Sequence, residues 1–148
     1  MRIPPESESD DVGGSSARLS GLLRQAGGEV ALAFTGTMTG IVRAAANGLA
    51  ERGVSTSIAY FPTVKPLDQK LLARCIGRSR LIVTVEEHST IGGFGSAVAE
   101  QMAARPTVPL LRVGVDDQFC CAAGSYRELL DRCGISAQEI VRRVLEHR

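Results

Sequence analysis

The stretch LIVTVEEHSTIGGFGSAVAEQMAAR, residues 81–105, decides how this chain folds. Its first five residues are leucine or β-branched, without polar alternation, which is typical of a strand covered on both faces of a parallel sheet. Two carboxylates, an imidazole and a group of glycines follow. We expect ligands or partners to meet this segment, because they usually bind at the carboxyl edge of an open α/β sheet. The candidate residues at this edge are Glu86, Glu87, His88, Ser89, Gly92, Gly93 and Gly95.

A helix is predicted immediately after this strand, with Ser89 or Thr90 capping its first turn. Residues at helical spacing would face the sheet, and these are Ile91, Gly95, Val98 and Met102. A glycine inside a helix costs about 1 kcal/mol relative to alanine. The glycines at 92, 93 and 95 therefore indicate that another backbone or a ligand approaches closely.

Strand and helix patterns alternate along the rest of the chain. We predict strands at 29–35, 54–61, 81–85 and 110–115, with helices at 37–52, 69–76 and 89–105 between them. Right-handed crossovers between parallel strands then predict an α/β fold, with three αβα layers around a doubly wound, mainly parallel sheet. Asp68 is placed to cap the second of these helices. The pairs Ser125–Glu128 and Ser136–Glu139 are capping-box patterns for two further helices near the C-terminus.

The N-terminal segment differs in composition from the rest. Residues 1–16 are acidic, rich in Ser, Gly and Pro, and nearly free of apolar side chains, so we expect a disordered tail. We predict a short helix at Ser20–Gln25 and one folded domain over residues 17–148. Met1 heads a natural-looking tail, which favours a natural chain over a fragment cut from a longer polypeptide.

Composition excludes several function classes. The 148 residues carry 17 basic and 16 acidic side chains, a net charge of +1, which offers no electrostatic case for binding nucleic acid or anionic membranes. No apolar run approaches the length of a membrane span, and the N-terminus lacks a signal-peptide pattern. We therefore expect a cytoplasmic protein. The cysteines form no Cys-x-x-Cys pair, so we interpret Cys75, Cys120, Cys121 and Cys133 as structural.

Gly36 follows the first predicted strand directly, and Thr37 or Thr39 can cap the next helix. Backbone N–H groups at such a strand–glycine–helix junction can bind an anion. The sequence GTMTG is not the dinucleotide fingerprint, however, and a tight turn explains Gly36 more simply. We keep Gly36 as a further candidate at the same sheet edge.

Five sequence blocks occur in a characteristic order: FTGTM, FPTVKPLD, VTVEEHSTIGGFGSAVAE, LLRVGVDDQF and GSYRELLDRCGISAQEIVRRV. Together they resemble the C-terminal domain of the transketolase family of thiamine-diphosphate enzymes. This family includes transketolases, deoxyxylulose-phosphate synthases and the beta subunits of 2-oxoacid dehydrogenases. The resemblance covers about Glu29–Arg148 and implies the α/β fold predicted above.

The resemblance also implies where the cofactor binds. In this family two other domains hold it, one through a Gly-Asp-Gly…Asn-Asn motif for magnesium and the diphosphate, the other through an activating glutamate. This sequence has a single asparagine, Asn47, no Gly-Asp-Gly, and only about 30 residues before the matching region. We therefore expect the chain alone not to bind thiamine diphosphate, and we assign no catalytic, cofactor-binding or metal-binding residue to it.

Two hypotheses of function follow. In the first, the chain is the C-terminal subunit of a split thiamine-diphosphate-dependent transketolase-like enzyme, non-catalytic alone. Separate chains would carry the cofactor-binding domains, thiamine diphosphate and Mg, in a hetero-oligomer built on a dimer, and the assembly would transfer a two-carbon ketol or acyl unit. In the second, it is a stand-alone module for a small anion or effector, or for oligomerisation, without catalysis. The candidate residues would form an interface in the first case and a ligand edge in the second.

Overall fold

The computed structural model describes residues 21–25, 28–104, 108–118 and 123–147. Five strands form one sheet in the order β1-β3-β2-β4-β5. The strands are β1 (Gly21–Gln25), β2 (Val30–Phe34), β3 (Thr56–Tyr60), β4 (Leu81–Ser89) and β5 (Leu110–Val115). Strands β2 to β5 are parallel, and β1 is antiparallel to its neighbour β3. The predicted mainly parallel sheet is confirmed.

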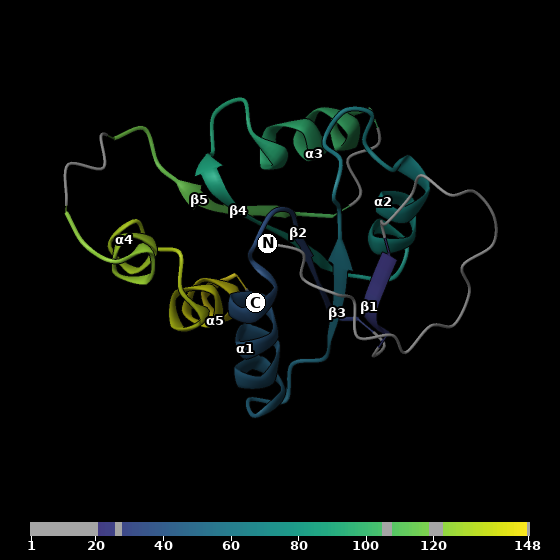
Figure 1. The fold of residues 1–148 in the computed structure, drawn as a ribbon. Coiled ribbons are helices and arrows are strands. Elements are labelled where there is room, and N and C mark those ends of the chain that lie inside the picture. Colours follow the sequence, from purple (N-terminus) through teal and green to yellow (C-terminus); the bar gives the residue numbers. More distant parts are fainter. Residues whose placement is uncertain (1–20, 26–27, 105–107, 119–122, 148) are drawn as a thin grey trace.

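Helices cover both faces of this sheet, which confirms the predicted three αβα layers (Figure 1). The helices are α1 (Thr39–Ala50), α2 (Gln69–Ile76), α3 (Phe94–Ala103), α4 (Tyr126–Arg132) and α5 (Ala137–Glu146). Side chains of α1, α4 and α5 pack on one face, and those of α2 and α3 pack on the other. Two predicted caps are confirmed, because Asp68 accepts the N–H of Leu71 and Ser125 forms a full capping box with Glu128. Ser136 also caps α5 by accepting the N–H of Glu139. The predicted cap of α1 is wrong: its N-cap residue is Met38, without a side-chain cap, and the hydroxyl of Thr37 instead donates to Glu87.

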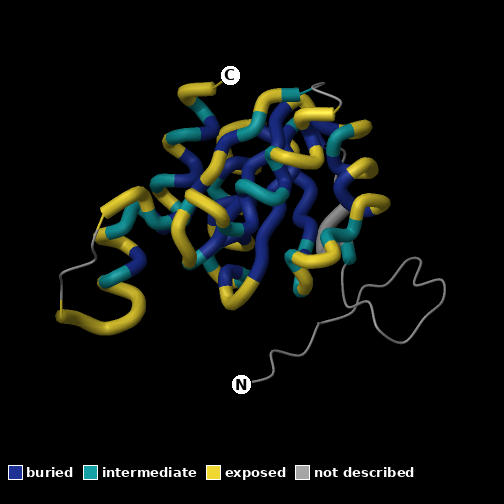
Figure 2. The backbone as a smooth tube through the Cα atoms, turned by 90° about the horizontal axis from the view of Figure 1, so that it is seen from above, coloured by how far each residue is buried: buried dark blue, intermediate teal, exposed yellow. Residues whose placement is uncertain are grey.

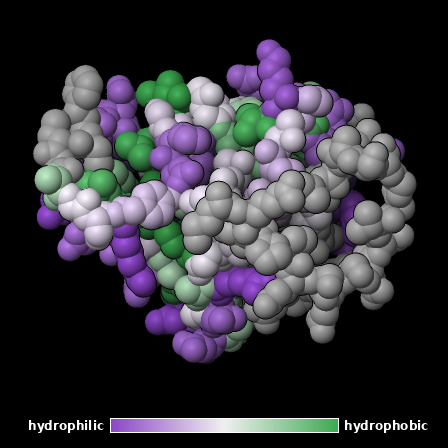
Figure 3. Space-filling view, in the orientation of Figure 1, coloured by the Kyte–Doolittle hydropathy of each residue, from purple (hydrophilic) through white to green (hydrophobic). Residues whose placement is uncertain are grey.

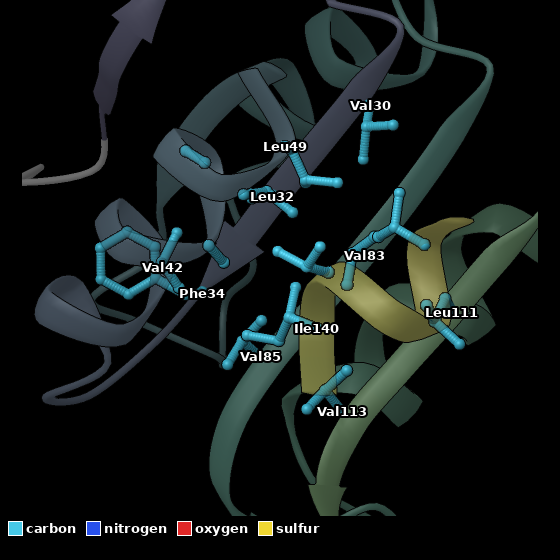
Figure 4. Close-up of a cluster of buried hydrophobic side chains, with 14 of the residues drawn as sticks. Val30, Leu32, Phe34, Val42, Leu49, Val83, Val85, Leu111, Val113 and Ile140 are labelled. Carbon is cyan, nitrogen blue, oxygen red and sulfur yellow. The ribbon is translucent and has the colours of Figure 1, made fainter. Parts of the chain in front are cut away.

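The strands divide their side chains between two cores, because successive residues of a strand point to opposite faces. In β2, Val30, Leu32 and Phe34 belong to the core with α1 and α5, whereas Ala31 and Ala33 belong to the core with α2 and α3. None of the five is more than 2% exposed. Figure 4 shows the first core, and Figure 2 shows buried strands enclosed by partly exposed helices.

The predicted helix at Ser20–Gln25 is wrong, because residues 21–25 form strand β1 instead. Its backbone pairs antiparallel with β3, from Gly21 opposite Tyr60 to Gln25 opposite Ser57. This pairing supplies hydrogen bonds from a partner more than thirty residues away in the chain. A run of about five residues carries too little periodicity to distinguish strand from helix.

The predicted start of the third helix is also wrong. Strand β4 continues to Ser89, well beyond the predicted end at Val85, and α3 begins only at Phe94 with Gly93 as its N-cap residue. Ile91 therefore lies outside the helix and is 64% exposed, rather than facing the sheet. The extension has a physical cause, since β5 continues to pair with β4 beyond an irregularity in register, up to Ser89.

The predicted tail, residues 1–16, and Cys120 and Cys121 lie outside the described residues. Cys75 is buried and Cys133 is partly exposed. Among the described residues, no helix is long and apolar enough to cross a membrane.

Candidate functional site

The carboxyl ends of β2 and β4 lie side by side, and the helices that follow them pack on opposite faces of the sheet. This arrangement is the topological switch point of a doubly wound sheet, where such folds usually bind their ligands. Glu86 and Glu87 stand at this point in β4. Strand alternation directs Glu86 towards α3, and it directs Glu87 towards the face with α1 and α4. The two adjacent carboxylates therefore have different surroundings.

Glu86 caps α3 from inside the domain. Its Oε2 accepts the backbone N–H of Phe94 at 2.6 Å, and its Oε1 accepts that of Gly95 at 2.7 Å. The residue is 1% exposed. The first amides of a helix have no partner within the helix, and a carboxylate there also interacts favourably with the helix dipole. Glu86 thus fills the place that a capping Ser89 or Thr90 was predicted to fill.

Small residues make room for this buried carboxylate. A Cβ atom on Gly93 would lie 2.2 Å from Glu86 Oε2, and one on Gly114 would lie 3.1 Å from Glu86 Cγ. A Cβ atom on Gly95 would lie 2.8 Å from Thr84 Oγ1. The close approach that the glycines predicted is therefore present, but Gly93 and Gly95 make it to residues of the same chain.

The loop between β4 and α3 is held by its own polar groups. The N–H of Ile91 donates to Ser89 Oγ, and the N–H of Gly92 donates to Ser96 Oγ. Gly92 has φ +75°, a left-handed conformation that favours glycine, and a Cβ atom there would meet nothing within 4 Å. Gly92 therefore serves the turn and lies open at the surface.

Glu87 forms a second cluster with two hydroxyl groups. Thr37, just after β2, donates from Oγ1 to Glu87 Oε2 at 3.0 Å, and Tyr126, at the start of α4, also donates its hydroxyl to Glu87 Oε2. The two hydroxyl oxygens are 2.8 Å apart. The cluster thus joins segments that precede α1, end β4 and begin α4.

The environment of Tyr126 raises the pKa of its phenol above the usual value. Partial burial is the largest cause, because it disfavours the phenolate, and the hydrogen bond to Glu87 acts in the same direction. The hydrogen bond with Thr37 opposes this shift. Tyr126 is therefore a hydrogen-bond donor at neutral pH rather than a base.

The exposed part of this edge combines polar and apolar groups. Ile91 is 64% exposed and Tyr126 is 56% exposed, and they are the large hydrophobic side chains exposed among the described residues. His88 and Ser89 are exposed as well. In Figure 3, an apolar group stands at the upper margin of the face, where Figure 1 shows the loop between β4 and α3. A partner that covered this edge would bury both polar and apolar surface.

The structure narrows the set of candidate residues that a partner could reach. Glu86 and Gly95 are buried within the domain. The accessible candidates are Gly36, Glu87, His88, Ser89, Gly92 and, in part, Gly93. Thr37 and Tyr126 were not among the predicted site residues. The capping box at Ser125 and Glu128 did place Tyr126 first in a helix, but nothing in the sequence places that helix beside β4.

Residues 20–140 match the model of the transketolase C-terminal domain. The chain belongs to this family. The resemblance seen in the five sequence blocks, and the fold that it implied, are thereby confirmed.

Individual relatives extend beyond the part that this chain matches. The 6-deoxy-6-sulfo-D-fructose transketolase subunit SqwH of Clostridium sp. (strain MSTE9) is 38% identical over 96% of this chain and 42% of its own length. A 1-deoxy-D-xylulose-5-phosphate synthase from Nitrosospira multiformis is 38% identical over 82% of this chain and 19% of its own length. This transketolase C-terminal domain therefore spans less than half of either relative.

Solved structures agree with the family assignment. A split-gene transketolase, solved as an inactive beta4 tetramer, superposes with a TM-score of 0.78 and 33% identity, over 86% of this chain and 41% of that one. A transketolase from Campylobacter jejuni superposes with a TM-score of 0.63 over 93% of this chain and 20% of that one. At 17% identity, the second similarity concerns the fold alone.

Proposed function

We propose that this chain is the C-terminal subunit of a split, thiamine-diphosphate-dependent transketolase-like enzyme. It completes and stabilises an assembly that transfers a two-carbon ketol unit, or an acyl unit derived from a 2-oxoacid. The observation that carries the proposal is the 38% identity with a transketolase subunit over 96% of the chain. The similarity to a split-gene transketolase, with a TM-score of 0.78, supports it.

In this proposal, thiamine diphosphate and Mg²⁺ are held by one or more separate partner chains. The carboxylates at the switch point do not fit a magnesium–diphosphate site, because both oxygens of Glu86 accept amides of α3 and Glu87 leaves only its Oε1 without a hydrogen bond from the described residues. Within the part of the chain that the structure describes, no group of three or more metal-binding side chains is present. In this proposal the chain acts through assembly, in a hetero-oligomer built on a dimer, and the complex is cytoplasmic.

The geometry of the carboxyl edge supports a protein interface. Exposed apolar side chains that lie beside polar groups are typical of surfaces covered in a complex, and Ile91 and Tyr126 provide them. The fixed loop around Gly92 presents Ile91 without a large loss of backbone freedom on binding. Docking at this edge would explain why the chain exposes these side chains.

A reconstitution experiment tests the proposal. The full chain is co-expressed with the cofactor-binding chains of the same source, recognised by their Gly-Asp-Gly…Asn-Asn motif, and the complex is isolated. We expect a stable hetero-oligomer whose ketol- or acyl-transfer activity depends on this chain, measured with thiamine diphosphate and Mg²⁺ present. A cofactor-binding chain with the same activity and the same oligomeric state in the absence of this protein would contradict the proposal.

The alternative is a module that binds a small anion or effector, or that serves only oligomerisation. Against anion binding, the amides of Ile91, Gly92, Phe94 and Gly95 already donate to side chains of the same chain. Glu87 beside Gly36 places a further carboxylate where an anion would bind. Thermal-shift screening of the full chain with sugar phosphates and nucleotides tests the ligand-binding alternative, because only a module that binds an anion or effector predicts stabilisation by such ligands alone.

A further inference from the structure

Glu87 is a partly exposed carboxylate that has no cationic partner among the described residues. Its Oε2 accepts the two hydroxyl groups of Thr37 and Tyr126, whereas its Oε1 accepts no hydrogen bond from the described residues. No basic side chain of the described residues forms an ion pair with it. Oε1 lies 3.2 Å from the position that a Cβ atom on Gly36 would occupy, so the absence of a side chain there leaves this oxygen open.

An open carboxylate is inexpensive in water but costly once a partner covers it. Removing a charge from water without a counter-charge costs several kcal/mol, and an ion pair with good geometry offsets much of that cost. The hydroxyls of Thr37 and Tyr126 already satisfy one oxygen, so the free Oε1 defines the missing contact. A surface that docks here must therefore bring a positive charge to Oε1.

The neighbouring groups favour a basic residue within a protein surface over a free cation. Ile91 and Tyr126 offer apolar area at the same edge, and the exposed face of a tyrosine ring attracts a guanidinium or ammonium group. Asp116 and Asp117, in the loop after β5, are exposed acids at this end of the sheet. The guanidinium of Arg112 at this edge lies on the α3 face, where it donates to the carbonyl oxygen of Thr90 and to Ser96 Oγ. Exposed acids beside exposed apolar side chains complement a basic residue flanked by apolar ones.

We infer that Glu87 receives an arginine or lysine side chain from the chain that carries the cofactor-binding domains. The basic group donates to Glu87 Oε1, Thr37 and Tyr126 hold the carboxylate in place, and Ile91 packs beside the contact. This inference rests on the proposed function and adds the chemistry of the partner surface. It also gives the polar cluster at the switch point a role in choosing the partner.

The test measures the affinity of the full chain for the co-purified cofactor-binding chain at about 50 mM and about 500 mM NaCl, where screening differs strongly. Glu87→Gln keeps an oxygen for the hydroxyls of Thr37 and Tyr126 but removes the charge. We expect this variant to bind at least about tenfold more weakly at low salt, with a smaller salt dependence than the unmodified chain. Glu100→Gln removes the same charge from an exposed position on α3, and we expect its affinity to stay within about twofold.

The possible outcomes are distinct. Equal affinities for Glu87→Gln and the unmodified chain, with a complex formed in both cases, would overturn the inference and leave the proposed function intact. Failure of the unmodified chain to form any complex would overturn the proposed function and the inference with it. Thermal unfolding of each variant shows whether the fold is retained, and the partner's basic residue is identified by a charge swap that restores binding to Glu87→Lys.

Discussion

Glu86 and Glu87 are neighbours in β4, yet they serve opposite sides of the sheet. Glu86 is 1% exposed, and both of its oxygens accept amides of α3. Glu87 is partly exposed, and one of its oxygens accepts hydroxyls from Thr37 and Tyr126 while the other is open. One carboxylate therefore stabilises the domain internally on one face of the sheet, and the other remains accessible to a partner on the opposite face.

Glycines and acids at this sheet edge have two roles: they form a closed, buried arrangement around Glu86 and an open, accessible one around Glu87. Around Glu86, Gly93 and Gly114 lack side chains because the carboxylate fills that space. Around Glu87, Gly36 lacks a side chain and is exposed, with φ +66°. The first arrangement is closed, and substitutions there should damage the fold. The second is open, and substitutions there should change binding.

The largest expected effect follows from removing each carboxylate. Glu86→Ala leaves two buried amides without an acceptor, and we expect it to lower the free energy of unfolding by about 3 kcal/mol or more. Glu87→Ala leaves hydroxyls that can turn to water, and we expect a loss below about 1 kcal/mol. Urea unfolding followed by circular dichroism measures both values. Losses of equal size would show that the two faces do not differ as described.

Gly93 provides a steric test of the closed side. A Cβ atom there would lie 2.2 Å from Glu86 Oε2 and 2.4 Å from the carbonyl oxygen of Ser89. We expect Gly93→Ala to lower stability by about 2 kcal/mol, because the carboxylate or the loop must move. Gly40→Ala in α1 is the matched control, since a Cβ atom there meets nothing within 4 Å, and it should raise stability by up to about 1 kcal/mol. A neutral Gly93→Ala variant would contradict the tight packing around Glu86.

A substitution of Thr84, on the same face of β4 as Glu86, is expected to raise stability, whereas those of Glu86 and Gly93 lower it. The Oγ1 of Thr84 is buried and has no hydrogen-bond partner in the part of the chain that the structure describes, and the residue is 0% exposed. Thr84→Val replaces this hydroxyl by a methyl group of similar size, so we expect the free energy of unfolding to rise by up to about 1 kcal/mol. Loss of stability on the same scale would instead mean that the hydroxyl has a partner in solution, such as a bound water molecule.

The sequence alone predicted the structural features that depend on residues close together in the chain. The β5 boundaries at Leu110–Val115, the Asp68 cap and the Ser125–Glu128 capping box all match the structure, because each depends on residues within a few positions. The alternation of strands and helices likewise predicted the layers, since each run is bounded by its own turn residues.

Structural features that depend on contacts between residues far apart in the sequence could not be predicted. The cap of α3 comes from Glu86, eight residues before Phe94, and not from a residue at the start of the helix. Strand β1 forms because β3 offers a pairing edge. Tyr126 meets Glu87 across 39 positions, so their contact is known only once α4 has been placed against the sheet. Thr37 and Tyr126, whose hydroxyls bind Glu87, were missed as site residues for this reason.

The smallest effect concerns the phenol of Tyr126, whose pKa is raised by partial burial and by its hydrogen bond to Glu87. A raised pKa means that folding favours the protonated phenol. Its contribution to stability is therefore fully present below the usual pKa of a tyrosine and is lost as the pH rises through the folded value. Because Tyr126 is largely exposed, we expect only a slight fall in stability in this alkaline range.

Absorbance titration of the phenolate measures this pKa directly, and Tyr60→Phe leaves Tyr126 as the one tyrosine that reports. In that background, Glu87→Gln should lower the pKa of Tyr126 towards its usual value, because the neighbouring carboxylate no longer disfavours the phenolate. Glu86→Gln should leave it unchanged, since that carboxylate faces α3 instead. If Glu86→Gln shifted the pKa of Tyr126 as much as Glu87→Gln does, the two faces of β4 would be electrostatically coupled. The two carboxylates would then not have the separate roles described above.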